Sequence, residues 1–93
     1  MMTAWPQNDQ QKFACPCCGY HTLIAPPPGT YTICEVCEWE DDGVQFNDVQ
    51  LRGGANAESL QEARAEFDRH EAIGRFGTRR RPLQQELPRH IWT

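Results

Sequence analysis

Two short stretches in the first half of the chain are expected to be β-strands, and in the second of them polar and hydrophobic positions alternate. Residues 21–24 have strand character, and so do residues 30–33, in which Tyr31 and Ile33 are expected to face the core. The proline-rich stretch between them is typical of a stiff turn, and residues 44–46 are a candidate third short strand. The pattern therefore predicts small β-hairpins.

A helical period replaces this alternation near Ser59 and predicts one amphipathic helix over about residues 59–73. Leu60, Ala63 and Phe67 fall on one face at helical spacing, with charged side chains mostly on the other. Ser59 and Glu62 match a capping box, in which each side chain satisfies a backbone amide of the first turn. We expect this helix to pack on the small sheet.

Length and cysteine content change how so small a fold is expected to be held together. The chain has 93 residues, five of them cysteine, and a core of this size gives only marginal stability by apolar burial. The N-terminus lacks an apolar signal stretch, and no apolar run approaches a membrane span, so a reducing cytoplasm is expected. There, closely paired cysteines indicate metal binding rather than disulfides.

Four of the cysteines form two pairs with the spacing of tetrahedral zinc ligands. Cys15 and Cys18 stand in one tight turn and Cys34 and Cys37 in another, each pair with two residues between its members. Two such pairs predict a four-thiolate zinc site, although iron in a rubredoxin-like site would use the same ligands. A thioredoxin-like redox pair is disfavoured because no βαβ pattern surrounds it. The expected fold class is a small α+β metal-bound domain, with zinc-ribbon or rubredoxin-like β-hairpins and one C-terminal amphipathic helix.

Two residues beside the predicted ligands each have more than one candidate role. Cys17 is surplus, and a small residue tolerated at the tip of the turn is favoured over an exposed reactive thiol or an alternative ligand. His21 is a candidate hydrogen-bond donor to a ligand sulfur, although an ordinary strand side chain is the more common case.

Charge is distributed unevenly and suggests a division of the chain. Residues 1–74 carry a net charge of −8 and residues 75–93 a net charge of +4. We expect a flexible lead over residues 1–12, a zinc-ribbon-like domain over 13–74 and a basic C-terminal tail over 75–93. The second cysteine pair is followed by an acidic run with an exposed tryptophan, which is the candidate partner-binding surface: Glu38, Trp39, Glu40, Asp41 and Asp42.

The cysteine turns and their neighbours resemble the bacterial cysteine-rich CPCC family. Three motifs occur in order, over about residues 13–70: Cys15-Pro16-Cys17-Cys18-Gly19-Tyr20 with Thr22-Leu23, residues 33–43, and Gly54-Ala55-Asn56 with residues 59–64. Glu35 stands where that family usually has proline. The resemblance implies a metal-binding ribbon of largely unassigned function, and it supplies no catalytic residue. Because some relatives sit beside toxin genes, it also makes an immunity-like role thinkable.

These observations favour a binding module over an enzyme. Four cysteines close the coordination shell, whereas a catalytic zinc keeps an open position. The acidic run suits a basic protein partner through electrostatic steering. The alternative is a nucleic-acid-binding zinc ribbon, which would use the basic and aromatic side chains of the tail: Arg75, Phe76, Arg79, Arg80, Arg81, Arg89 and Trp92. The negative charge of the preceding residues disfavours it.

Overall fold

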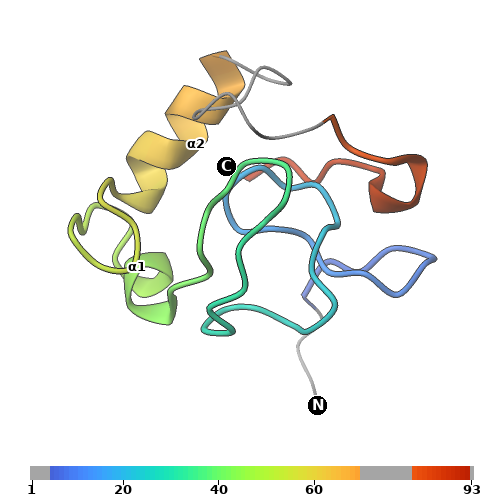
Figure 1. Ribbon diagram of the computed structural model, residues 1–93, viewed down its shortest axis with the longest axis horizontal. Coiled ribbons are helices and arrows are strands. Elements are labelled where there is room, and N and C mark those ends of the chain that lie inside the picture. The colour runs from blue at the N-terminus through green and yellow to red at the C-terminus, as the bar shows by residue number, and fades with distance from the viewer. Residues whose placement is uncertain (1–4, 70–80, 93) are drawn as a thin grey trace.

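In the computed structural model, residues 5–69 and 81–92 are described, and within them regular secondary structure is sparse. Helix α1 spans Gly43–Asn47, helix α2 spans Leu60–Arg69 and the 3-10 turn η1 spans Gln84–Glu86. Figure 1 shows α1 and α2 on one side, with irregular loops of the first half of the chain beside them. The C-terminal segment turns back across these loops and ends near the middle of the molecule (Figure 1).

The predicted β-hairpins are not seen in the described residues, which contain almost no strand. Strand pairing is limited to isolated antiparallel bridges: Gln7 with Phe13, Phe13 with Leu23, and Ile33 with Glu40. Tyr31 has a φ of 60°, which interrupts an extended strand. Tyr31 and Ile33 are consequently 56% and 57% exposed rather than directed into the core.

The predicted third strand is instead the short helix α1. The Asp42 carboxylate accepts hydrogen bonds from the backbone amides of Val44 at 2.8 Å and Gln45 at 3.3 Å, which is the geometry of a helix N-cap. The same carboxylate accepts a bond from the Ala55 amide at 2.9 Å. Asp42 therefore starts the helix and ties it to the following loop.

Two buried amide side chains fix that loop. The Gln45 amide nitrogen donates to the carbonyls of Leu51, Asn56 and Glu58. Asn56 accepts a hydrogen bond from the Glu40 amide at 2.9 Å and donates to the Glu40 carbonyl at 2.8 Å. Gln45 and Asn56 are also bonded to each other. Side-chain hydrogen bonds thus satisfy buried backbone groups that would be paired between strands in a β-sheet.

Helix α2 has the predicted start and the predicted buried face. The Glu62 amide donates to Ser59 Oγ at 3.1 Å, and the Ser59 amide donates to the Glu62 carboxylate at 3.0 Å, so the capping box is present. Leu60, Ala63 and Phe67 are fully buried. The expected end of the helix, residues 70–73, lies outside the described residues. Within the described part of the chain, no helix has the length and apolar character needed to cross a membrane.

Both terminal segments make contacts with the rest of the chain where they are described, over residues 5–12 and 81–92. The Trp5 indole donates to the Ala14 carbonyl at 2.8 Å. The Asn8 side chain donates to the carbonyls of Gln85 and Leu87, which joins the two segments directly. Arg75, Phe76, Arg79 and Arg80 of the predicted basic tail lie outside the described residues.

The hydrophobic core is built around the cysteines themselves. All five cysteines are buried, and the core that they form also contains Val36, Trp39 and the buried face of α2. Tyr20 packs edge-on against Phe67, with ring centroids 6.3 Å apart. The candidate metal site therefore lies inside the core rather than at its edge.

Candidate metal centre

Two tight turns with matching backbone bonds position the four predicted ligands. In the first knuckle, residues 15–20, the Cys15 amide donates to the Tyr20 carbonyl at 2.9 Å. In the second knuckle, residues 34–39, the Cys34 amide donates to the Trp39 carbonyl at the same distance, 2.9 Å. The two knuckles are thus equivalent residue by residue.

Each knuckle also aims one backbone amide at a ligand sulfur. The Cys17 amide lies 3.4 Å from Cys15 Sγ, and the Val36 amide lies 3.4 Å from Cys34 Sγ. The chain then turns back through a positive φ, 85° at Gly19 and 68° at Glu38. Amides directed at sulfur stabilise negative charge there, so both turns suit thiolates.

The four predicted ligand sulfurs converge on one point. The sulfurs of Cys15, Cys18, Cys34 and Cys37 all lie within 4.8 Å of one another. The Cys15–Cys37 and Cys18–Cys34 sulfur pairs are 3.6 and 3.8 Å apart. A tetrahedral ion with metal–sulfur bonds of about 2.3 Å requires sulfurs about 3.8 Å apart. The four cysteines are therefore positioned to bind a metal ion, and their donor set fits zinc.

The electrostatics of this cluster require a cation if the sulfurs are to be ionised. Burial raises the pKa of the Cys15 and Cys18 thiols well above the ordinary thiol value. Burial acts in the same direction on Cys37, but hydrogen bonds from the neighbouring cysteines outweigh it and lower the pKa of that thiol. Four thiolates packed together would repel one another, and a divalent ion removes that repulsion.

Cys17 and His21, which stand near the first pair of predicted ligands in the sequence, are both buried. Cys17 is 2% exposed and occupies the position of Val36 in the second knuckle, so it is a core residue and the exposed reactive thiol considered above is wrong. His21 is buried, and burial is the main cause that lowers its pKa. The hydrogen bond to a ligand sulfur comes from its neighbour, because Thr22 Oγ1 lies 3.1 Å from Cys34 Sγ. Sequence reasoning missed Thr22.

Three members of the expected partner-binding run are buried, so that part of the surface prediction is wrong. Trp39 is 1% exposed and packs among the cysteines. Asp41 is 1% exposed because its carboxylate accepts bonds from the Thr30 amide at 2.9 Å and the Thr30 hydroxyl at 2.7 Å. Asp42 is 5% exposed because it caps α1. Only Glu38 and Glu40 keep partly exposed side chains.

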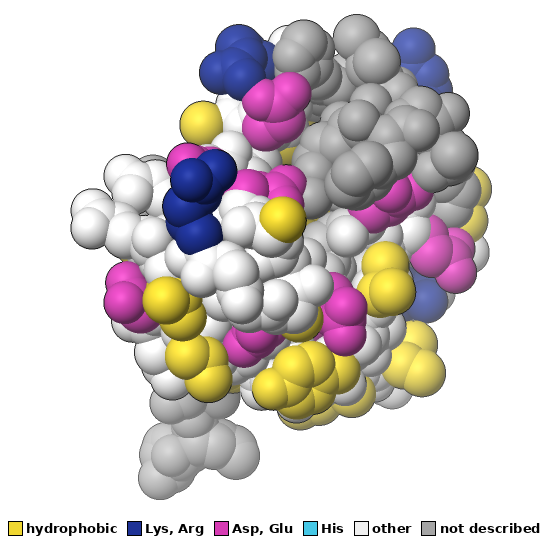
Figure 2. Space-filling model, turned by 60° about the vertical axis from the view of Figure 1, so that its left-hand side comes forward, with side chains coloured by type: hydrophobic (Ala, Val, Ile, Leu, Met, Phe, Trp, Pro, Cys, Tyr) yellow, Lys and Arg dark blue, Asp and Glu magenta, His cyan; other side chains and the backbone are white. Residues whose placement is uncertain are grey.

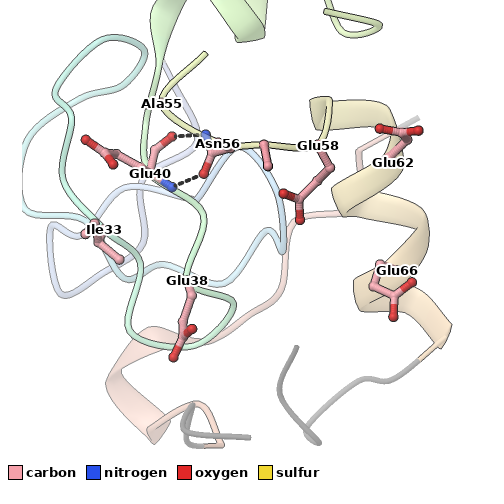
Figure 3. Close-up of a pocket in the computed structure, with 9 residues that line it drawn as sticks. Ile33, Glu38, Glu40, Ala55, Asn56, Glu58, Glu62 and Glu66 are labelled. Carbon is pink, nitrogen blue, oxygen red and sulfur yellow. Dashed lines mark hydrogen bonds between the residues drawn. The ribbon is translucent and has the colours of Figure 1, made fainter. Parts of the chain in front are cut away.

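These two glutamates belong to a different acidic surface, which the sequence pattern did not reveal. A groove of about 500 Å³ is lined by Glu38, Glu40, Glu58, Glu62 and Glu66, and also by Ile33, Ala55, Asn56 and Ala57. Figure 3 shows α2 contributing one wall of this acidic groove and the second knuckle the other, with Glu58 between them. Figure 2 shows acidic side chains at several separate places on one face, with hydrophobic ones between them.

The first knuckle is covered by donors from distant parts of the chain. Arg64 Nε donates to the Pro16 carbonyl at 2.8 Å, and Arg89 Nε donates to the Cys18 carbonyl at 2.7 Å. The Trp92 indole donates to the Cys15 carbonyl at 2.8 Å. Arg89 and Trp92, assigned above to a nucleic-acid-binding tail, are thus engaged inside the molecule.

The region that contains the four cysteines matches a known protein family. No curated protein matches the chain. Residues 13–86 match the family described as cysteine-rich CPCC, and this range includes both knuckles, α2 and η1. With its paired cysteines, its buried four-sulfur cluster and a match over most of its length, the chain belongs to the cysteine-rich CPCC family.

Proposed function

We propose that the protein is a non-enzymatic module that binds zinc structurally and a basic protein partner at the acidic groove. Support for a structural rather than catalytic ion comes from the donor set. Four buried cysteine sulfurs complete a tetrahedral shell and leave no position for water or substrate. Zinc is favoured over iron because zinc is the common ion of structural four-cysteine sites.

The proposed ion requires reduced thiols, so the proposed compartment is the cytoplasm. Native mass spectrometry tests the ion directly. The expected mass is that of the chain plus one zinc, less the protons displaced from the thiols. A mass equal to the metal-free chain with five thiols would contradict the zinc proposal.

The observation that carries the partner proposal is the acidic groove itself. Five glutamates from the second knuckle, the following loop and α2 surround a cavity with apolar side chains along it. Such a surface attracts a positively charged protein and speeds its association. A nuclease-like toxin, whose substrate groove is basic, is one class of partner that fits, and the role would then be immunity-like.

Binding of nucleic acid through the tail is the competing function. Two of its proposed contacts are already used, because Arg89 contacts Cys18 and Asp68, and Trp92 contacts Cys15. The other arginines considered, apart from Arg81, lie outside the described residues. An acidic groove also opposes phosphate binding.

Affinity capture from native lysate with charge-matched variants separates the two functions. One variant neutralises the groove with Glu38→Gln, Glu40→Gln and Glu58→Gln. Its control removes the same charge elsewhere on the exposed surface with Asp9→Asn, Glu35→Gln and Asp48→Asn.

We expect the wild-type chain to capture a protein both before and after the lysate is treated with nuclease. Salt should release this protein, and only the groove variant should fail to capture it. Equal capture by both variants would contradict the groove. Capture abolished by nuclease would favour the nucleic-acid alternative.

A further inference from the structure

Two arginine side chains that lie far from the first knuckle in the sequence donate hydrogen bonds to its backbone. Arg64 reaches the Pro16 carbonyl from the middle of α2, and Arg89 reaches the Cys18 carbonyl from the C-terminal segment. The second knuckle has the Thr22 hydroxyl at its sulfur instead. The two halves of an otherwise equivalent site therefore differ in their charge surroundings.

The bond from Arg64 is special because of the peptide group that it touches. The Pro16 carbonyl and the Cys17 amide belong to one peptide unit, and that amide lies 3.4 Å from Cys15 Sγ. A cation at the carbonyl end polarises the peptide and strengthens its amide as a donor. Arg64 therefore acts on Cys15 sulfur through a single peptide group.

The corresponding path from Arg89 does not reach a sulfur. The Cys18 carbonyl shares its peptide unit with the Gly19 amide, which donates to the Cys15 carbonyl at 3.0 Å. The charge of Arg89 is also paired with Asp68. Of the two arginines, Arg64 is the one whose charge and geometry both favour a thiolate.

Arg64 also has the surroundings expected of a charge-compensating group. It is half-buried, its guanidinium lies 5.2 Å from the centre of the Trp92 ring, and no carboxylate pairs with it among the residues described. Burial lowers the pKa of Arg64, whereas the nearby Cys17 and Cys15 thiols raise it. A half-buried cation without a carboxylate is stabilised by nearby negative charge. Four thiolates around a divalent ion carry a net charge of about −2 and supply it.

We propose that Arg64 is a positioning residue of the metal centre, which holds the first knuckle at Pro16 and stabilises the negative charge of the thiolate shell through the Cys17 amide. This inference rests on the metal-binding part of the proposed function and is independent of the partner. It predicts that the charge of Arg64, and not only its packing, sets metal affinity.

The test compares Arg64→Gln, which keeps an amide donor but removes the charge, with Arg64→Lys, which keeps the charge. Arg69→Gln is the matched control, because Arg69 lies on the same helix, is exposed and pairs with Glu66. Zinc affinity is measured by competition with a chromophoric chelator. Protein loaded with iron instead provides a reduction potential, and cobalt(II) absorption reports whether the four-thiolate shell is intact.

Loss of a group that supports a ligand typically lowers metal affinity about 10- to 100-fold, and we expect about 10-fold for Arg64→Gln with an unchanged cobalt spectrum. The reduction potential of the iron-loaded variant should fall, because the reduced site carries more negative charge. Arg64→Lys should recover most of both effects, and Arg69→Gln should match the wild type.

Equal affinities and potentials in Arg64→Gln and Arg69→Gln would overturn the inference while leaving the metal site in place. Equal losses in Arg64→Gln and Arg64→Lys, including loss of the cobalt spectrum in both, would overturn it as well, since charge would not be the cause. Absence of metal from the wild-type protein would instead refute the proposed zinc site itself.

Discussion

Replacing Glu38 by glycine should stabilise the protein, although glycine usually weakens ordered structure. Glu38 has a φ of 68° and occupies the position that Gly19 holds in the first knuckle with a φ of 85°. A side chain in this left-handed region costs about 1–2 kcal/mol. Glycine loses more freedom on folding, which offsets about 0.5–1 kcal/mol of that gain. The free energy of unfolding should therefore rise by about 0.5–1 kcal/mol, apart from any contribution of the carboxylate.

Comparison with Glu38→Ala removes the carboxylate from the argument, because both variants lack it. Alanine keeps the strained φ, so the glycine variant should be more stable than the alanine variant by about 1 kcal/mol. Urea unfolding at a buffered free-zinc concentration, followed by tryptophan fluorescence, measures this difference. If the alanine variant were as stable as the glycine variant, the reasoning from backbone strain would be refuted.

The reverse change at the equivalent position of the first knuckle, Gly19→Ala, should destabilise the protein. A Cβ at Gly19 would lie 1.8 Å from the His90 carbonyl oxygen, so Gly19→Ala adds a clash to the unfavourable φ. The C-terminal segment would have to move away, which breaks the bond from the His90 amide to the Gly19 carbonyl at 2.8 Å. Together with the bond from Arg89 to Cys18, the cost should reach about 3 kcal/mol.

Three further perturbations test other parts of the structure. Chelation of the metal should unfold the domain, because the four cysteines are core residues; circular dichroism and tryptophan fluorescence should change together, and retention of the native spectra by the metal-free chain would contradict this. Asn56→Ala should cost about 2–4 kcal/mol in urea unfolding, because it removes the side chain that pairs with both the amide and the carbonyl of Glu40, whereas Asn47→Ala at an exposed position should cost under about 0.5 kcal/mol. Cys17→Val should change stability by less than about 1.5 kcal/mol and leave the zinc stoichiometry at the wild-type value, since Val36 fills the equivalent position; loss of bound zinc would show that Cys17 is a ligand.

The sequence was sufficient for those features whose causes are local. Two residues between paired cysteines already define a turn that brings two sulfurs together, so the positions of Cys15, Cys18, Cys34 and Cys37 could be inferred from spacing. The capping box at Ser59 is equally local, and the structure has both of its hydrogen bonds. Helical spacing likewise identified the buried face of α2.

The acidic run, residues 38–42, does not form a single exposed surface. Asp42 is also a candidate helix N-cap residue, and that signal favours a helix over the predicted third strand. Burial of Asp41 depends on Thr30, and burial of Trp39 depends on the knuckle that it closes. Charge density alone predicts exposure, but hydrogen bonding to the backbone overrides it.

The contacts that cover the first knuckle could not be predicted from local patterns. The partners of Pro16, Cys18 and Cys15 lie 48, 71 and 77 residues away in the chain. The same arginine and tryptophan residues in a proline-containing C-terminal stretch have the composition of a solvated basic tail. Only the structure shows that these arginine and tryptophan side chains donate to backbone carbonyls of the first knuckle and so belong to the folded domain.

These contacts also explain why two equivalent knuckles can have different roles. The first knuckle directs its outer carbonyls to Arg64, Arg89 and Trp92, so its exterior is occupied by the chain itself. The second knuckle instead presents Glu38, and the adjoining Glu40, to the acidic groove. Because both knuckles share one four-sulfur cluster, an ion that fixes the first knuckle also fixes the backbone that carries these two glutamates. A rigid charged surface binds with less loss of entropy than a mobile one, so a structural ion serves the proposed partner binding without taking part in it.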